Sequence, residues 1–249
     1  MAKSRSRLIS FDFEPGATLV DKYVVEEKLG GGWEGEVYRI REKMTGVERA
    51  AKFFYPQRNE KDQAVKFYAK KLHTLRDCPI LIQYVTQERM AVQGEPVTFL
   101  VSEYAEGQPL SEFINQQPGK RLPPFEALHL LHALSQGMAM IHSKREFHGD
   151  LHTGNVLVRR RGLGFDVKLV DFYNLQGYKK REQIQEDVIG LVQILHAAVG
   201  GARHYSKQPP EIKRVVRGLK YSLIQQRFRS ALDIKDYLEG LTWAEDEER

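Results

Sequence analysis

The sequence predicts an α+β fold, with an antiparallel sheet and one helix in the first half and mostly helices in the second. Strand-like stretches that break at glycine or proline turns fill residues 23–54 and 80–103. Only residues 60–76 interrupt them with a long run free of Gly and Pro, as is typical of a helix. From residue 105 onward, most apolar residues recur with helical spacing.

In the first half, two loosely alternating stretches flank Gly30-Gly31-Gly32, which predicts a hairpin with the glycines at its turn. A third stretch follows, and a further pair is joined by a turn around Gly94. The expected strands are residues 23–29, 36–40, 47–54, 80–88 and 97–103.

In the second half, Pro123-Pro124 opens a helix that we expect to run to about His142, because its apolar residues share one face. A β-type strand pair around residues 148–170 interrupts the helical pattern. Shorter helices are expected at residues 109–116, 183–199, 210–219 and 231–241.

Composition restricts the class of protein. The chain has 249 residues, 41% of them hydrophobic, and no apolar run near the ~20 residues that cross a bilayer. Its single cysteine, Cys78, excludes an internal disulfide and suits a cytoplasmic location. The net charge of +5 allows acidic partners but is too modest to indicate nucleic acid. Neither a membrane nor nucleic acid is therefore expected as a partner.

The stretch His148–Val158 carries the residues with the clearest chemistry. Asp150 precedes Asn155 by five residues, and Asp171 follows a second apolar run. Phosphoryl transfer requires such groups: a carboxylate that accepts the proton of the attacking hydroxyl, and oxygen ligands that hold magnesium against phosphates. A tight turn between two strands, without chemistry, would give a similar short pattern. The other motifs of the chain decide between these interpretations.

The run His-Gly-Asp-Leu-His-Thr-Gly-Asn, followed by Asp-Phe-Tyr, resembles the catalytic loop and magnesium triplet of the protein kinase superfamily, H-R-D-L-x-x-x-N and D-F-G. The resemblance implies that Asp150 is the catalytic base and that Asn155 and Asp171 bind Mg²⁺. It implies the two-lobed kinase fold, with a basic N-terminal arm at residues 1–19, an N-lobe at 20–104 and a C-lobe at 105–249.

Three glycines fit the G-x-G-x-x-G-x-V loop that covers ATP phosphates in kinases: Gly30, Gly32 and Gly35, followed by Val37. Glycine lets backbone N–H groups approach phosphate oxygens without obstruction by a Cβ atom. A flexible hairpin or a Rossmann turn has similar glycines, but a helix follows a Rossmann turn and a strand is expected here. The strand context therefore favours the kinase loop.

Ala50-Ala51-Lys52 resembles the V-A-I-K segment of kinases, whose lysine contacts the ATP phosphates, which implies a catalytic role for Lys52. Most lysines are surface residues, but the apolar neighbours of this one argue against a fully solvated site. The segment 99–107 resembles the kinase hinge. The residues that the resemblance assigns to the adenine ring are Val37, Ala50, Glu103, Ala105 and Leu157.

Two departures concern activation. Gly149 replaces the arginine that binds an activation-loop phosphate in many kinases. Only fifteen residues separate Asp171 from Asp187, and Tyr173 and Tyr178 are their only hydroxyl side chains. We therefore expect activity without loop phosphorylation. Asp187 itself resembles the aspartate that ties down the catalytic loop.

Another departure concerns Lys52. The expected helix offers it no glutamate, because no acidic residue lies between Gln63 and Arg76, and Tyr68 or Ala69 takes the usual place. We expect Lys52 to pair with Asp171 when nucleotide is absent.

These observations predict an ATP- and magnesium-dependent phosphotransferase, a bacterial-type serine/threonine kinase acting on protein. His152 replaces the usual catalytic-loop lysine, as in aminoglycoside and choline kinases, so a small-molecule acceptor stays an alternative. The missing helix glutamate leaves a pseudokinase, a binding or scaffold module, as another. The joint presence of Lys52, Asp150, Asn155 and Asp171 argues against a pseudokinase.

Overall fold

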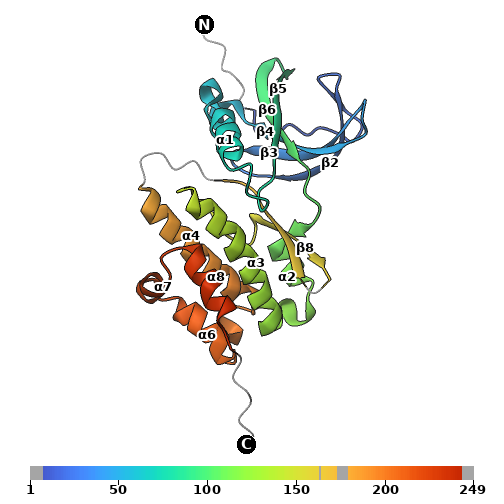
Figure 1. Cartoon of the computed structure of the whole chain (residues 1–249). Helices are drawn as coiled ribbons and strands as arrows, with labels where there is room; N and C mark the ends of the chain where they lie inside the picture. Colours follow the sequence, from blue (N-terminus) through green and yellow to red (C-terminus); the bar gives the residue numbers. More distant parts are fainter. Residues whose placement is uncertain (1–7, 163, 173–178, 243–249) are drawn as a thin grey trace, which may run out of the picture. The chain divides into compact units, whose positions relative to one another are not determined.

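The computed structural model describes residues 8–162, 164–172 and 179–242 (Figure 1). The chain divides into two compact units, Met1–Asp77 with Ile82–Ala105, and Cys78–Leu81 with Glu106–Arg249. A sheet dominates the first unit and helices dominate the second, so the predicted α+β, two-lobed fold class is confirmed. We call the units the N-lobe and the C-lobe.

A six-stranded antiparallel sheet forms the N-lobe, in the order β1-β2-β3-β4-β6-β5. The predicted hairpin is present: β2 and β3 flank the glycine-rich turn and pair with each other. The strands are β1 (Thr18–Leu19), β2 (Tyr23–Gly31), β3 (Gly35–Glu42), β4 (Glu48–Phe54), β5 (Tyr84–Val92) and β6 (Glu95–Glu103). Short 3-10 turns at Pro56–Arg58 (η1) and Glu60–Asp62 (η2) lead into helix α1 (Gln63–Thr74).

The two faces of the sheet pack against different parts of the N-lobe. Successive side chains of a strand point to opposite faces. Tyr38, Ile40, Phe53 and Phe99 point to one face and are fully buried in the N-lobe core. Helix α1 packs on the other face, where the Phe54 ring tilts against that of Tyr68 of α1, with 5.5 Å between ring centroids.

The segment after residue 7 covers the core face of the sheet. The sequence predicts a basic arm over residues 1–19, and within it Leu8 and Phe11 are buried members of the N-lobe core. The Phe11 ring stacks on Tyr55 at 5.2 Å and the Phe13 ring tilts against Phe53 at 4.9 Å. Aromatic burial therefore attaches this segment to the lobe.

The strand expected at residues 80–88 begins later, at Tyr84. Residues Cys78–Leu81 belong to the C-lobe, where the Leu169 amide donates to the Ile80 carbonyl at 2.8 Å. Ile80 also fills the space beside Gly137, where an added Cβ would lie 2.3 Å from Ile80 Cδ1. An apolar run occurs both in strands and in buried connecting segments. The sequence pattern therefore predicts a strand at residues 80–83, where the structure has a connecting segment.

The C-lobe holds the helices and a small sheet of the order β7-β8-β9. Its strands are β7 (Gln108–Pro109), β8 (Val156–Arg161) and β9 (Gly164–Leu169). Its longer helices are α3 (Pro124–Ser143) and α4 (Lys180–Ala198), close to the predicted bounds. The shorter ones are α2 (Leu110–Asn115), α5 (Ala202–Tyr205), α6 (Pro210–Val216), α7 (Tyr221–Arg227) and α8 (Ala231–Glu239), with 3-10 turns η3 (Pro118–Lys120) and η4 (Arg217–Leu219).

The sequence does not predict helices α5 and α7, because each has fewer than two helical turns, too few for an apolar residue pattern to repeat. Within the described residues, no helix has both the length and the apolar character needed to cross a membrane.

Candidate active site

The glycine-rich turn is built by pairing of β2 and β3, in which Gly30 lies opposite Val37. The Gly32 amide donates to the Gly35 carbonyl at 2.9 Å and closes the turn. Only Gly35 is required sterically, since an added Cβ there would lie 1.8 Å from the Phe53 carbonyl oxygen. At Gly30 and Gly32 an added Cβ would meet no atom within 4 Å. No packing contact therefore requires glycine at these two positions. Its effect there is to leave the backbone accessible.

Lys52 has a carboxylate partner that the sequence analysis missed. Its ammonium nitrogen lies 2.6 Å from Glu34 Oε2, and Glu34 is part of the glycine-rich turn. The Tyr68 hydroxyl accepts from Lys52 Nζ at 2.9 Å and donates to Glu34 Oε2 at 2.9 Å. The Tyr68 ring also lies under the ammonium, 4.2 Å from Nζ to the centroid. The turn thus provides the charge that helix α1 lacks, and Tyr68 occupies the helix position that usually holds the glutamate in kinases.

The pairing of Lys52 with Asp171 that we expect from the sequence would join the two lobes. This pairing stays a prediction. The contact of Lys52 with Glu34 lies entirely within the N-lobe.

Within the N-lobe, three of the residues assigned to ATP share one face of the sheet. Val37 lies opposite Lys52 across β3 and β4, and Ala50 is two residues away on the same strand as Lys52. Directly paired residues, and residues two apart, point to the same face. The structure therefore brings Val37, Ala50 and Lys52 together on the face that bears α1.

The remaining adenine candidates lie at two other places. The Glu103 amide, at the end of β6, donates to the Gln83 carbonyl at 2.8 Å, and the Gln83 amide donates to Glu103 Oε2 at 3.1 Å. Ala105 ends the N-lobe, and Leu157 lies on β8 of the C-lobe, opposite Lys168. Their roles towards adenine stay predictions.

In the C-lobe, Asp187 of helix α4 holds the loop that carries Asp150. Its carboxylate accepts from the His148 amide at 2.7 Å and from the Gly149 amide at 2.9 Å. It also accepts from His142 Nε2 at 3.2 Å. Asp187 is 1% exposed, and three donors compensate for the burial of its charge. The expectation that Asp187 ties down the loop is confirmed.

Asn155 links the two ends of the loop. Its Nδ2 donates to the Asp150 carbonyl at 2.8 Å and to Asp150 Oδ2 at 3.1 Å. The Val170 amide, next to Asp171, donates to the Asn155 carbonyl at 3.0 Å. Because the amide nitrogen makes both side-chain contacts, the carboxamide oxygen is the Asn155 atom that would serve as a cation ligand. This oxygen and a carboxylate of Asp171 fit the preference of Mg²⁺ for oxygen donors.

The loop histidines are fixed in definite tautomers by their neighbours. His148 Nδ1 accepts from the Asp150 amide at 3.3 Å, so its proton lies on Nε2, which donates to the Val170 carbonyl at 2.9 Å. His152 Nδ1 accepts from the Gly154 amide at 3.0 Å. Its Nε2–H therefore faces Asp150 Oδ2, at 3.7 Å. His148 thus connects the segment before Asp171 with the Asp150 loop, a role that its place in the motif did not reveal.

Asp171 adopts a left-handed backbone conformation, with φ of 58°. Phe172, the next residue, is buried, with its ring 4.8 Å from that of His148. Tyr173 and Tyr178 lie outside the described residues.

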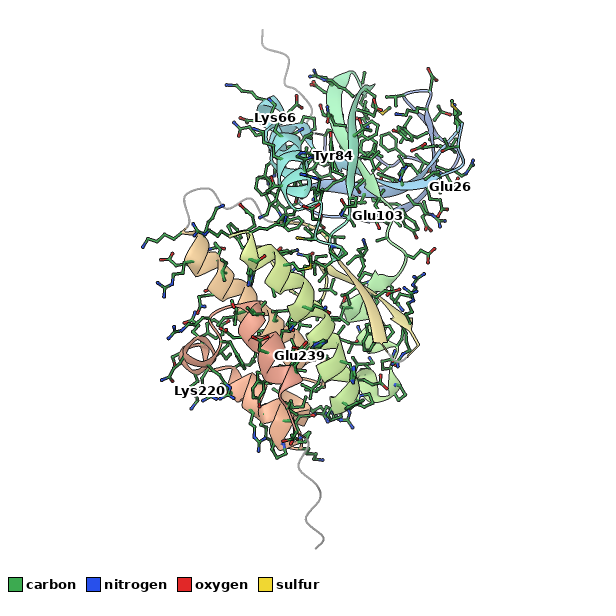
Figure 2. The ribbon with its side chains drawn as sticks, viewed as in Figure 1. Glu26, Lys66, Tyr84, Glu103, Lys220 and Glu239 are labelled. Carbon is green, nitrogen blue, oxygen red and sulfur yellow. The ribbon has the colours of Figure 1, made fainter. Side chains whose placement is uncertain are left out.

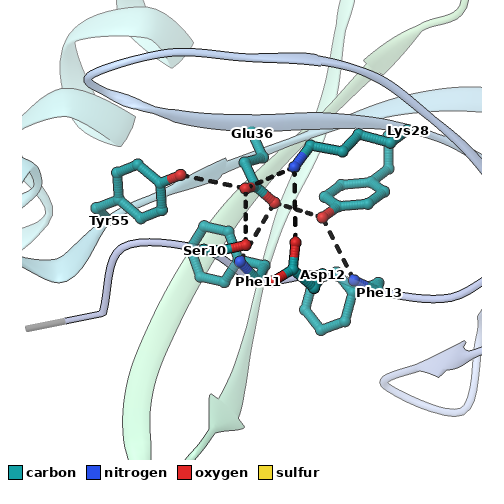
Figure 3. Close-up of polar contacts among 8 residues, drawn as sticks. Ser10, Phe11, Asp12, Phe13, Lys28, Glu36 and Tyr55 are labelled. Atoms are coloured by element: carbon teal, nitrogen blue, oxygen red, sulfur yellow. Dashed lines mark hydrogen bonds and ion pairs between the residues drawn. The ribbon is translucent and has the colours of Figure 1, made fainter.

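A buried carboxylate lies behind the glycine-rich turn, on the core face of β3. Glu36 accepts hydrogen bonds from Ser10 Oγ, the Phe11 amide and the hydroxyls of Tyr38 and Tyr55, and it pairs with Lys28 Nζ at 2.7 Å (Figure 3). Burial raises the pKa of Glu36, but the hydrogen bonds from Lys28, Tyr38 and Phe11 outweigh it and lower the pKa below its usual value. Burial, with the charge of Glu36 nearby, raises the pKa of Tyr55 to about 12.

The protein kinase domain family matches residues 23–195 of the chain. The chain belongs to the protein kinase family. The matched part includes the glycine-rich turn, Lys52, the Asp150 loop and Asp187.

Several kinases resemble the chain in sequence. It is 26% identical to the cyclin-dependent kinase B2-2 of Arabidopsis thaliana over 78% of the chain and 62% of that kinase. It is 28% identical to the serine/threonine-protein kinase pkn2 of Myxococcus xanthus over 64% of the chain and 19% of that protein. The chain thus spans less than two thirds of the length of these curated relatives.

The PknI kinase domain of Mycobacterium tuberculosis has a similar fold, with a TM-score of 0.64 at 20% identity, over 91% of this chain and 98% of that one. At this level of identity, the likeness concerns the fold.

Proposed function

We propose that the chain is a protein kinase that transfers the γ-phosphoryl group of ATP, with magnesium, to serine or threonine of a protein substrate. The observation that carries the proposal is the arrangement around Asp150. Its carboxylate is 3.1 Å from Asn155 Nδ2, in a loop whose backbone is held by the buried Asp187. A fixed carboxylate next to an amide oxygen ligand is what phosphoryl transfer requires of a protein.

Each residue of the proposed site has a role that follows from its chemistry. Asp150 accepts the proton of the substrate hydroxyl as the oxygen attacks phosphorus. Lys52 neutralises phosphate charge, and the open backbone at Gly30 and Gly32 approaches the phosphates, with Gly35 fixing the turn. Asn155 and Asp171 hold magnesium, which supplies charge neutralisation on the phosphates when bound. The residues that would enclose adenine and contact its edge are Val37, Ala50, Leu157, Glu103 and Ala105.

A small-molecule kinase is the second candidate, and His152 favours it. The ring Nε2–H of His152 faces the Asp150 carboxylate at 3.7 Å, at the position where protein serine/threonine kinases usually have lysine. Family membership and the two kinase relatives favour the protein substrate. A pseudokinase is disfavoured because Lys52 does have a carboxylate partner.

We also propose a bacterial-type kinase that acts in the cytoplasm. The support is the resemblance to the Myxococcus kinase and the single cysteine, Cys78, which is a buried thiol.

The experiment that tests the function is a transfer assay with γ-labelled ATP and magnesium. Three acceptors are compared: a generic protein mixture such as casein and histone, an aminoglycoside, and choline. Label on serine or threonine of protein, found by hydrolysis to phosphoamino acids, is the expected result. Label on a small molecule alone would replace the proposal with the second candidate. No transfer to any acceptor, together with ATP binding, would favour the pseudokinase.

A further inference from the structure

A strongly basic surface lies on the C-lobe, over residues 200–229. This segment has eight Lys and Arg residues and one carboxylate, a formal net charge of +7, whereas the whole chain has +5. All other residues together therefore carry a formal −2. The eight residues that we call the basic surface are Arg203, Lys207, Lys213, Arg214, Arg217, Lys220, Arg227 and Arg229.

The segment has no exposed carboxylate that could neutralise these basic charges at the surface. The carboxylate of the segment, Glu211, is 2% exposed, on the inner face of α6 with Ile212 and Val215. The outer face of α6 carries Lys213 and Arg214, which are exposed. In the described C-lobe, ion pairs form elsewhere, as between Lys180 and Glu146 or Lys235 and Glu239, and none includes the basic surface.

Hydrogen bonds and chain connections gather the basic surface into one region. Lys213 Nζ donates to the Ser206 carbonyl at 2.8 Å, which joins α6 to the end of α5. The Gly218 amide donates to the Tyr205 hydroxyl at 2.8 Å, which joins η4 to α5. The η4 turn also contacts both α6 and α7. Lys220, directly before α7, projects from the edge of the lobe (Figure 2).

The composition of the region selects among anionic partners. Single-stranded nucleic acid needs aromatic side chains on which bases stack. Tyr221 is the only exposed large hydrophobic side chain described in the segment, and its hydroxyl accepts from Gln193 Nε2 at 2.7 Å. The same scarcity disfavours stable attachment to a membrane surface, which combines attraction to anionic lipids with apolar insertion. Five of the eight basic residues are arginines, whose planar guanidinium pairs with carboxylates through two parallel hydrogen bonds.

We propose that the basic surface binds an acidic segment, rich in Asp and Glu, of the protein that this kinase phosphorylates. This inference rests on the proposed function, because it assumes a protein substrate. The acidic segment lies apart from the phosphorylated residue in the substrate chain. Binding it raises the local concentration of the acceptor at the catalytic loop.

The test measures binding of a fluorescent Glu-rich peptide to the full chain without ATP, by anisotropy at low ionic strength. One variant carries Lys207→Gln, Arg214→Gln and Lys220→Gln, three exposed positions outside the candidate active site. A control variant removes the same charge from the N-lobe through Lys43→Gln, Lys70→Gln and Arg89→Gln, also exposed. The first variant should weaken binding by about tenfold, and added salt should weaken binding to the wild-type chain. The control should bind like the wild type.

Equal weakening by both variants would show attraction by net charge alone and would overturn the proposal. Tighter binding of a single-stranded DNA of equal charge would assign the surface to nucleic acid instead. Peptide binding only when the acidic residues 245–248 are changed to Gln would assign it to the chain's own C-terminal residues. Because no ATP is present, a failure here is distinct from a failure of the proposed function. Phosphorylation of a peptide without acidic residues should be the same in the first variant and the wild type.

Discussion

Lys52 Nζ and Glu34 Oε2 lie 2.6 Å apart, which places a carboxylate of the glycine-rich turn on the lysine that would contact ATP phosphates. The Glu34 carboxylate and a nucleotide phosphate both attract this ammonium, so we expect Glu34 to reduce the favourable effect of Lys52 on ATP binding. Tyr68 is neutral, and its hydroxyl accepts from the ammonium, so we expect this contact to persist beside the phosphate charge. We therefore expect Glu34 to hold Lys52 in the empty site, and Tyr68 to position Lys52 with and without nucleotide.

Glu34→Gln should tighten ATP binding by roughly two- to tenfold, because the variant removes the competing charge. Tyr68→Phe should weaken it by roughly tenfold or more, the cost of one hydrogen bond to a charged group. Titration calorimetry with ATP and magnesium measures both. Glu26→Gln is the matched control, since Glu26 pairs with Arg41 at the same 2.6 Å in the same lobe. Weaker binding by Glu34→Gln would mean that Glu34 replaces the helix glutamate as a positioning residue.

Glu36→Gln should lower the stability of the folded chain. The variant deprives Lys28 and two tyrosine hydroxyls of a buried carboxylate, at a cost of roughly 1–3 kcal/mol. The pKa of Glu36 is lowered in the folded protein, so its contribution is complete above pH 4.5, the ordinary value, and is lost as the pH falls through the lower folded value.

Thermal unfolding of both proteins across pH measures this effect. The difference between wild type and Glu36→Gln should be constant near neutrality and should shrink below about pH 4.5. Glu88→Gln, which breaks an exposed pair with Lys22, should leave the unfolding temperature unchanged. A difference that stays constant down to acid pH would show that the charge of Glu36 is not what stabilises the segment 8–13.

Asp171→Asn should remove the tightening of ATP binding by magnesium, because an amide is a weaker ligand for a hard cation than a carboxylate. Asn155→Ala should reduce it and should also release Asp150, to which Asn155 Nδ2 donates at 3.1 Å. The measurement is ATP affinity with and without magnesium. Asp166→Asn on β9, which breaks a 3.0 Å pair with Arg159, should respond to magnesium like the wild type. Equal magnesium dependence in all three variants would place the metal site elsewhere.

Phosphatase treatment should not change the turnover rate. Gly149 has no side chain to bind a phosphate, and its amide is already bound to Asp187 at 2.9 Å. The double variant Tyr173→Phe/Tyr178→Phe should likewise keep the rate of the wild type. A rate that falls severalfold after either change would reveal a switch by phosphorylation.

The motifs of the C-lobe were predictable because their contacts either join residues close in sequence or involve a single residue, Asp187, of a predictable helix. Asp150 and Asn155 are close in sequence, and Asp187 precedes the buried core of a helix with a clear apolar pattern. Glu34 was not predictable. The direction of its side chain depends on the register of β2 and β3, which shifts between Val25 and Glu27 and again between Lys28 and Gly30. No periodic pattern reveals such irregularities.

The packing of the segment after residue 7 was not predictable, for another physical reason. The basic residues 3, 5 and 7 dominate the composition of the first residues, whereas Phe11 and Phe13 decide how the segment packs. Likewise, Cys78–Leu81 has the apolar pattern of a strand, and only its pairing with Leu169 assigns it to the C-lobe. Sequence periodicity shows that a residue is buried, but not which lobe buries it.

We propose that Asp150 takes the proton of a substrate hydroxyl during transfer from ATP. Asp150→Asn keeps the size of the side chain and removes the base. The direct measurement is the single-turnover rate of label transfer from γ-labelled ATP to protein by this variant and by the wild type, with ATP affinity measured in parallel. We expect the rate of Asp150→Asn to be lower by roughly 10²–10⁴-fold, with ATP affinity unchanged. A near-normal rate in Asp150→Asn would contradict the proposal.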